Sequence, residues 1–226
     1  PLGNTLVFTA GLVPLNIWLA RVLALATAAE SRRNLFFRAT FFAPVVTSAV
    51  AWAIVWKFLL QGEQGIVNRI LAPAGIAGPD WLRSEGLAMA AVIGTRVIKN
   101  LGMNIVIYLA AVTNLPEELY EAARIDGAGA VQRFKALTVP LLMPTTLMIA
   151  IITVIGSLKV FDHIMLMTSG GPNNSTMVLV YYLHYQGFQM FETGYAGALA
   201  TILFLIVLGL TLIQWSARKR LAYQEE

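Results

Sequence analysis

Cysteine is absent from the 226 residues, which excludes disulfides, thiolate metal sites and a cysteine nucleophile. Histidine is scarce: His163 and His184 are the only two, and they are too far apart in sequence to suggest a metal cluster. The sequence has no P-loop of the form GxxxxGKS or GxxxxGKT, so this chain does not bind ATP in the P-loop manner. It also has no evident Ser/His/Asp set and no pair of catalytic acids. We therefore predict no catalytic residue and no metal ligand.

Charge is also in short supply. Charged residues make up 12% of the chain, half of the roughly 25% typical of soluble domains, while 58% of the residues are hydrophobic. This composition predicts a protein embedded in a lipid bilayer. The basic residues are spread along the chain rather than gathered in one stripe, so nucleic acid is not an expected partner.

Five segments are long and apolar enough to cross a bilayer, which takes about 20 residues. They cover residues 5–29, 39–60, 87–112, 138–167 and 194–215. Pro14, Asn16 and Arg21 interrupt the first, so we expect it to be kinked and to face other helices in part. The expected fold class is an all-α membrane protein, a polytopic helical bundle in which residues 1–226 form one transmembrane domain.

Basic residues are distributed unevenly between the two sets of loops. Loops 61–86 and 168–193 hold two of them, Arg69 and Arg83, whereas nine flank the spans on the other side. Because Lys and Arg are enriched in cytoplasmic loops, we expect the nine, and the C-terminus, to be cytoplasmic. The nine are Arg32, Arg33, Arg38, Arg124, Arg133, Lys135, Arg218, Lys219 and Arg220.

The span at 87–112 carries an unusual polar stripe: Arg96, Lys99, Asn100 and Asn104. Its eleven Leu, Ile and Val residues favour insertion by roughly 3–7 kcal/mol in total, while the two cations cost about 2.5–3.5 kcal/mol each. The stripe is therefore expected to face other helices or a wet cavity. It is either a wall of a translocation path or a structural stripe that pairs with carbonyl groups.

A polar stretch, residues 114–136, separates the third and fourth apolar segments. Asn114 and Glu117 are spaced as in a capping box, which predicts that Asn114 caps a short helix. Gly127 is expected to end that helix, because glycine readily adopts the left-handed conformation of a helix stop. A second amphipathic turn follows, so the stretch predicts a helix–turn–helix on the membrane face.

The same residues carry a family resemblance. Glu121-Ala122-Ala123, then Gly127, then Leu137-Thr138-Val139-Pro140 resembles the EAA signature of the permease subunits of binding-protein-dependent ABC importers. Leu137 and Val139 replace the usual Ile and Leu, which are mild aliphatic changes. The resemblance implies that Glu121, Ala122, Ala123, Asp126 and Gly127 form the helix that couples the permease to its ATPase.

A second signature lies in the outer loop. Phe161-Asp162, followed by Met167-Thr168 and then Gly170-Gly171-Pro172, resembles the "first" permease subunit of the maltose and glycerol-phosphate type, in the carbohydrate-uptake branch. This resemblance assigns Gly170, Gly171 and Pro172 to a loop facing the binding protein. It leaves Arg96, Lys99, Asn100, Asn104 and Asp162 as candidates for the translocation path.

The family implies partners and a location. A second permease subunit would complete a heterodimer, and two copies of a cytoplasmic ABC ATPase and an extracytoplasmic solute-binding protein would complete the importer. No cofactor is expected on this chain, since ATP and Mg would be bound by the ATPase. The location would be the cytoplasmic (inner) membrane of a bacterium or archaeon. Asn4-Thr5-Leu6 with Phe8-Thr9 resembles the opening of the family's second span, so an earlier span is expected before residue 1.

One alternative comes from a different class of protein. An ion- or proton-coupled secondary transporter would use Lys159, Asp162 and His163 as an intramembrane relay, with Lys159 and Asp162 paired across one helical turn. Such a carrier needs no ATPase partner and no coupling helix. An integral membrane enzyme would need a catalytic constellation, and none is evident.

Overall fold

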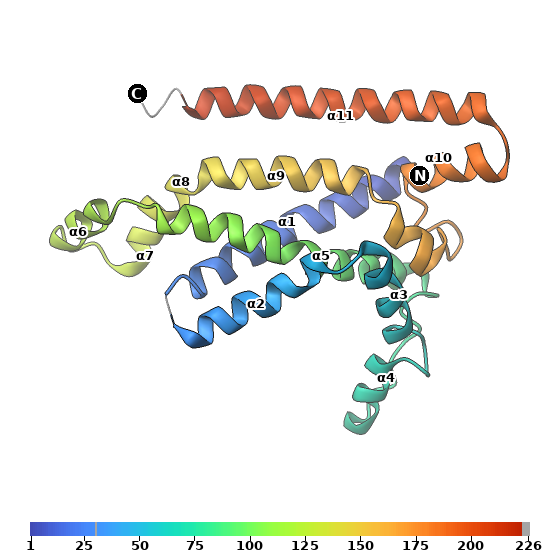
Figure 1. Ribbon diagram of the computed structural model, residues 1–226, viewed down its shortest axis with the longest axis horizontal. Coiled ribbons are helices and arrows are strands. Elements are labelled where there is room, and N and C mark those ends of the chain that lie inside the picture. Colours follow the sequence, from blue (N-terminus) through green and yellow to red (C-terminus); the bar gives the residue numbers. More distant parts are fainter. Residues whose placement is uncertain (30, 223–226) are drawn as a thin grey trace.

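The computed structural model describes residues 1–29 and 31–222, and within them all regular structure is helical (Figure 1). Three helices are long and apolar enough to cross a membrane, or up to five if each of two bent pairs forms one span. The helices are α1 (Leu2–Ala26), α2 (Arg32–Val46), α3 (Ala49–Leu59), α4 (Ile66–Leu71), α5 (Glu85–Thr113), α6 (Glu117–Ile125), α7 (Ala130–Arg133), α8 (Val139–Leu141), α9 (Met143–Leu158), α10 (Leu179–His184) and α11 (Thr193–Ala222). Short 3-10 or π turns lie at Ala72–Ala74 (η1), Phe134–Thr138 (η2), Ile164–Thr168 (η3) and Tyr185–Gln189 (η4).

Helix α5 is the centre of the bundle, and α1, α2 and α9 pack against it. The buried residues of α1 recur three or four positions apart, from Thr5 through Phe8 and Leu12 to Asn16, Ala20 and Ala24. That spacing places them on one stripe of the helix, which faces α5 and α9. The expected span at 5–29 is confirmed as a helix that faces protein, and Pro14 lies within it without ending it.

The expected span at 39–60 is not one continuous helix. The chain forms α2 and α3 instead, bent by 104° at Thr47 and Ser48, whose extended ψ angles of 141° and 140° interrupt the helix. Pro44, in the last turn of α2, lacks an N–H group, which weakens the helix just before the bend. Helix α3 then turns aside toward α4, as Figure 1 shows.

The expected span at 138–167 is also divided. Residues 130–141 and α9 meet at a bend of 56°, next to Leu142, and α9 ends at Leu158. The chain resumes as the π turn η3, which packs against α3. The expected spans at 87–112 and 194–215 match α5 and α11.

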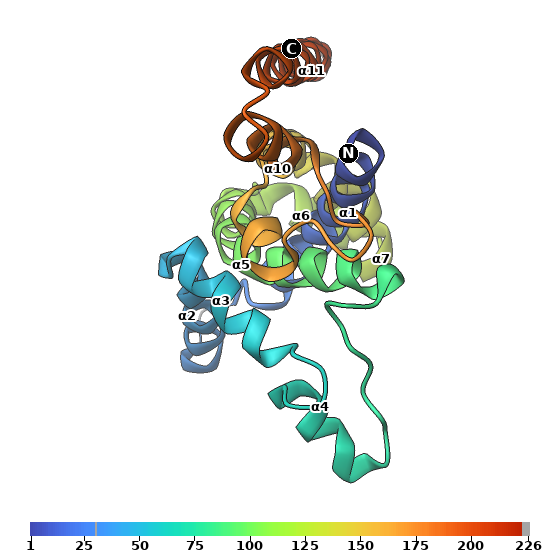
Figure 2. The same ribbon diagram turned by 90° about the vertical axis from the view of Figure 1, so that its right-hand side faces the viewer.

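Helix α11 stands apart from the rest of the bundle, as Figure 2 shows when the molecule is viewed end-on. In its most apolar window 6% of the residues are buried, against 50% in α5. Its contacts within the described residues are with α9, α10 and η4. An apolar helix so little covered by its own chain has most of its surface left for lipid or another subunit.

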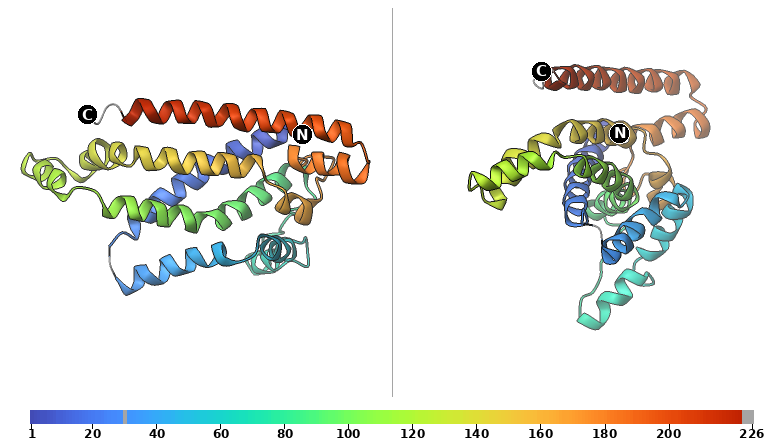
Figure 3. Two further views of the ribbon diagram at one scale, coloured as in Figure 1. Left: turned by 45° about the horizontal axis from the view of Figure 1, so that its top comes forward. Right: turned by 60° about the vertical axis from the view of Figure 1, so that its left-hand side comes forward.

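The loops gather at two ends. What we call the α6 end holds residues 27–29 and 114–138, and the α4 end holds residues 61–84 and 168–192 (Figures 1 and 3). The N-terminus lies beside α10 at the α4 end, and α11 runs back toward the α6 end. The two loop sets that differ in their basic residues therefore lie at opposite ends of the molecule.

Candidate functional site

The pair α6–α7 projects beyond the bundle at the α6 end (Figure 3). No residue of α6 is buried. Glu121, Ala122 and Asp126 are exposed and Ala123 is half-buried, so the signature residues lie at the surface. Ile125 is 87% exposed and Val131 67%, which leaves an apolar surface on the same projection. A shallow cavity of about 530 Å³ lies beside the turn that follows α6, lined by Asp126, Gly127, Ala128, Gln132, Lys135 and Ala136.

Gly127 ends α6 as expected, with a φ of +76° in the left-handed region. The backbone N–H of Ala128 then donates to the carbonyl of Ala123 at 2.9 Å, which closes the helix end. The expected cap at Asn114 is wrong. Asn114 closes α5 instead, its Nδ2 donating to the Ala110 carbonyl at 2.8 Å, and Pro116 opens α6 without a side-chain cap.

Lys99 binds the break between α2 and α3. Its Nζ donates to the carbonyls of Pro44 and Thr47, and lies 3.4 Å from the Val45 carbonyl. At the bend the Pro44 carbonyl keeps one backbone donor, the N–H of Thr47 at 3.2 Å, and an ammonium supplies up to three further donors. The structural interpretation of the stripe, pairing with carbonyls, therefore holds for Lys99.

Asn104 and Asn16 link α5 to α1 inside the bundle. Asn104 Nδ2 donates to Asn16 Oδ1, and Asn16 Nδ2 donates to the Val97 carbonyl at 3.0 Å. Oγ1 of Thr153, on α9, lies 3.5 Å from Nδ2 of Asn104. These bonds give each of the two buried amides a partner inside the bundle, as buried polar groups require.

Arg96 has a different environment. Its Nη1 lies 3.4 Å from Nδ1 of His163, which is fully buried. Its Nε is buried and has no partner among the described residues. Together with Lys99, Asn100 and Asn104, Arg96 lines a cavity of about 260 Å³, whose other lining residues are Val45, Met103, Ile152, Thr153 and Gly156. The four residues of the predicted polar stripe thus line one cavity, whereas Asp162 does not line it.

The expected helical pairing of Lys159 with Asp162 is wrong. Helix α9 ends at Leu158, and Val160 and Phe161 are not helical, so the two residues do not share a helix. Lys159 is exposed, whereas His163 is fully buried beside Arg96. Within residues 1–29 and 31–222 no group of three or more His, Asp or Glu residues is placed to hold a metal ion.

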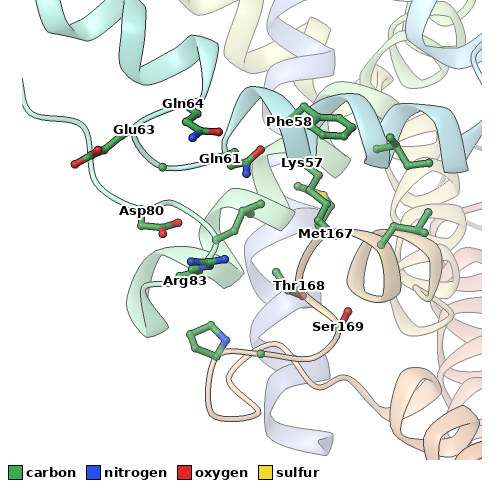
Figure 4. A pocket seen from close by; sticks show the side chains of 16 residues that line it. Lys57, Phe58, Gln61, Glu63, Gln64, Asp80, Arg83, Met167, Thr168 and Ser169 are labelled. Carbon is green, nitrogen blue, oxygen red and sulfur yellow. The ribbon is translucent and has the colours of Figure 1, made fainter.

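The α4 end holds a cavity of about 910 Å³ (Figure 4). Gln61, Glu63 and Gln64 lie on one rim, and Thr168 and Ser169 lie opposite them, at the end of η3 and directly after it. Gly171 and Pro172 line this cavity, whereas Gly170 turns inward: a Cβ at Gly170 would lie 2.9 Å from the ring of Tyr181.

Sequence reasoning missed the face of α5 that receives α2 and α3. The Thr95 carbonyl accepts a hydrogen bond from Trp52 Nε1 at 3.0 Å, and a Cβ on Gly102 would lie 2.2 Å from the Phe41 carbonyl oxygen. Thr95, Lys99 and Gly102 are four and three residues apart, so they share one helical face. That spacing predicts a polar or small-residue face on α5 that another segment packs against. No local pattern indicates which segment covers this face.

Comparisons with known proteins agree with this architecture. Residues 16–219 match the family described as binding-protein-dependent transport system inner membrane component. The chain is 35% identical over 181 residues to the probable ABC transporter permease protein YurN of Bacillus subtilis (strain 168), covering 79% of this chain and 62% of YurN. It is 35% identical over 226 residues to the lactose transport system permease protein LacF of Rhizobium radiobacter, covering 97% of this chain and 76% of LacF.

A solved structure shares the fold. A chain from the crystal structure of a bacterial alginate ABC transporter, in complex with alginate pentasaccharide-bound periplasmic protein, superimposes with a TM-score of 0.84 at 23% identity. The match covers 94% of this chain and 75% of that one. With residues 16–219 inside the family match and LacF at 35% identity, this chain belongs to the binding-protein-dependent transport system inner membrane components, and several of its relatives are named as sugar transport permeases.

Proposed function

We propose that this chain forms half of the translocation path of an ATP-driven importer for a sugar or sugar-like solute. A cytoplasmic ATPase would dock on α6 and supply the energy. The chain itself would hydrolyse nothing, and ATP and Mg would be bound by the ATPase. In this proposal the α6 end, including residues 114–136 and the C-terminus, faces the cytoplasm.

The exposed surface of α6–α7 is the observation that carries this proposal. Ile125 and Val131 are largely exposed on a projection that no other part of the described chain covers. A short helix with an exposed apolar face is suited to a groove in a partner protein. Ala122 allows a close approach of that partner, and the exposed carboxylate of Glu121 provides a contact for a basic residue.

Two further partners are part of the proposal. The solved alginate transporter contains a periplasmic protein bound to alginate, by its title, and the 910 Å³ cavity at the α4 end would face such a solute-binding protein. Gly171 and Pro172 lie on that cavity. The uncovered surface of the bundle would be shared between lipid and a second permease subunit, which supplies the other half of the path.

The source of the energy that drives solute uptake tests this proposal. The chain is reconstituted in proteoliposomes with the second permease, the ATPase and the binding protein, and solute uptake is measured with and without ATP on the ATPase side. Uptake should require ATP and should persist when ionophores collapse all ion gradients. Uptake that proceeds without ATP and stops with the ionophores would identify a secondary transporter and contradict the proposal.

A further inference from the structure

Three cations lie in the interior of the bundle, and the chain itself binds two of them. Lys99 is held by the carbonyls at the α2–α3 bend. Arg21 donates from Nη2 to Thr146 Oγ1 at 2.6 Å, and its guanidinium carbon lies 5.7 Å from the centre of the Tyr108 ring. Both contacts compensate for part of the cost of a charge away from water, although Arg21 Nε, like Arg96 Nε, is buried without a partner among the described residues.

Arg96 lacks comparable compensation. Its one hydrogen-bond contact within the described residues is the 3.4 Å approach to His163 Nδ1, which is long for such a bond. A guanidinium only donates, so Nδ1 must accept and the ring proton must sit on Nε2. That Nε2 is also buried without a partner. Two neighbouring donor groups, Arg96 Nε and His163 Nε2, are thus left without acceptors.

The cavity beside Arg96 contains no acid that could supply an acceptor. Its polar lining is Arg96, Lys99, Asn100, Asn104 and Thr153, none of which is anionic. Asp162 is close enough for its charge to act on Arg96, but it does not line the cavity. A charged side chain within a span is costly, and it typically marks a path or pairs with an opposite charge. The lining of this cavity therefore carries positive charge and no negative charge.

We propose that Arg96 is a specificity-determining residue and that this cavity receives the acidic group of an anionic carbohydrate as it crosses the membrane. The acidic group would be a carboxylate or a phosphate, the anions that a guanidinium binds best. At about 260 Å³ the cavity is near the small end of ligand pockets, which run from roughly 300 to 1,000 Å³, so it suits one sugar ring with its acid. This inference rests on the proposed function, because it names the class of solute for the same path.

The first experiment identifies the solute. The cognate binding protein is purified from cells grown on a hydrolysate that mixes neutral and acidic saccharides, and the released ligand is analysed by mass spectrometry. A ligand with a carboxylate or phosphate is expected, and its mass distinguishes the two. A neutral ligand would overturn the inference.

The second experiment measures uptake of that ligand by the complete reconstituted complex. We expect Arg96→Gln to lower uptake by about tenfold or more, the loss expected for one charge-assisted hydrogen bond, and Arg96→Lys to lower it less. Arg21→Gln is the matched control, since Arg21 is also an interior arginine but does not line the cavity; it should not select between acidic and neutral solutes. Wild-type uptake by Arg96→Gln would overturn the inference.

Two other groups are alternative partners for the charge of Arg96, and further measurements on the Arg96 variants distinguish them. If Asp162 balances its charge, the double variant Arg96→Gln with Asp162→Asn should regain wild-type uptake. If a carboxylate of the second permease does so, Arg96→Gln should release that subunit during purification. Either result would overturn the inference. Uptake of an acidic solute that depends on Arg96 but not on ATP would instead contradict the proposed function and leave the charge selectivity standing.

Discussion

Helix α5 and the pair α6–α7 follow each other in the chain, but they differ in whether their polar residues are buried or exposed. On α5, Lys99 and Asn104 are buried and bonded to groups of the same chain. On α6 no residue is buried, and Glu121 stays exposed beyond the bundle. The contacts of Lys99 and Asn104 lie within the chain, whereas the exposed surface of α6 is available to a partner outside it.

This comparison predicts two kinds of variant. Changes on the α2-facing side of α5 should damage the folded protein, since they remove internal contacts. Changes on α6–α7 should leave folding nearly intact and damage the association with a partner. The following experiments test that separation, from the largest expected effect to the smallest.

Gly102→Leu should have the largest effect. A Cβ at Gly102 would lie 2.2 Å from the Phe41 carbonyl oxygen and 2.9 Å from the Phe42 Cα, both backbone atoms that cannot turn aside. We expect a loss at or above the upper end of the ~1–3 kcal/mol typical of overpacking. Size-exclusion chromatography after heating measures it. Gly94→Ala on the same helix, with open space around its Cβ, should elute like the parent; equal behaviour of the two variants would contradict the packing described.

Glu121→Lys should abolish function without unfolding the protein. Glu121 is exposed, so folding should change by no more than about 0.5 kcal/mol. A reversed charge in a docked interface costs about 2–5 kcal/mol, which corresponds to at least tenfold weaker capture of the ATPase. Pull-down of the ATPase and solute-stimulated ATP hydrolysis measure the effect. Glu63→Lys, an exposed acid at the α4 end, is the control and should retain capture. Undiminished capture by Glu121→Lys would mean that α6 is not the coupling helix.

Gly127→Val should weaken the same association by a different route. The φ of +76° at Gly127 is a conformation that a β-branched residue rarely adopts, and the strain amounts to about 1–3 kcal/mol. Gly127→Asn is the control, because asparagine tolerates left-handed backbone. ATPase capture should fall for valine and be largely retained for asparagine. Equal losses of ATPase capture in the two variants would indicate that any side chain at this position disturbs the association, whatever its effect on the turn.

Lys99→Met should lower stability moderately. It removes the donor that satisfies the Pro44 and Thr47 carbonyls, and hydrogen bonds to charged groups contribute about 1.5–3 kcal/mol. For a chain of this size that corresponds to a fall in Tm of roughly 3–12 °C. Lys57→Met, at an exposed position of α3, should leave Tm unchanged. An unchanged Tm in Lys99→Met would show that the bend does not depend on this lysine.

Single cysteines at Ala77 and Ala130 should have the smallest effect. Both positions are exposed and the chain has no other cysteine, so labelling is free of background and transport should be unaffected. On intact cells an impermeant thiol reagent should label Ala77→Cys and not Ala130→Cys. The reverse pattern would place α6 outside and contradict the proposed orientation.

Hydropathy and local stereochemistry were sufficient for much of this protein. The runs that became α1, α5 and α11 are long enough to span a bilayer, and apolar length depends only on the segment itself. The helix stop at Gly127 is local in the same sense, because it reflects the one residue type that adopts positive φ at no steric cost. The inward orientation of Lys99 and Asn104 followed from the cost of leaving them in lipid.

The choice of partners was decided only by the tertiary structure. The 104° bend between α2 and α3 sits where Lys99, some 50 residues later, supplies donors to the Pro44 and Thr47 carbonyls, and no local pattern reports so distant a contact. Asn114 closes α5 rather than opening α6, since either helix end was within reach of its side chain. Lys159 and Asp162 are three apart in sequence but not on one helix, because the chain breaks after Leu158 to place η3 against α3. Sequence thus determined which groups need a partner, whereas the packing of distant segments determined which partner each one has.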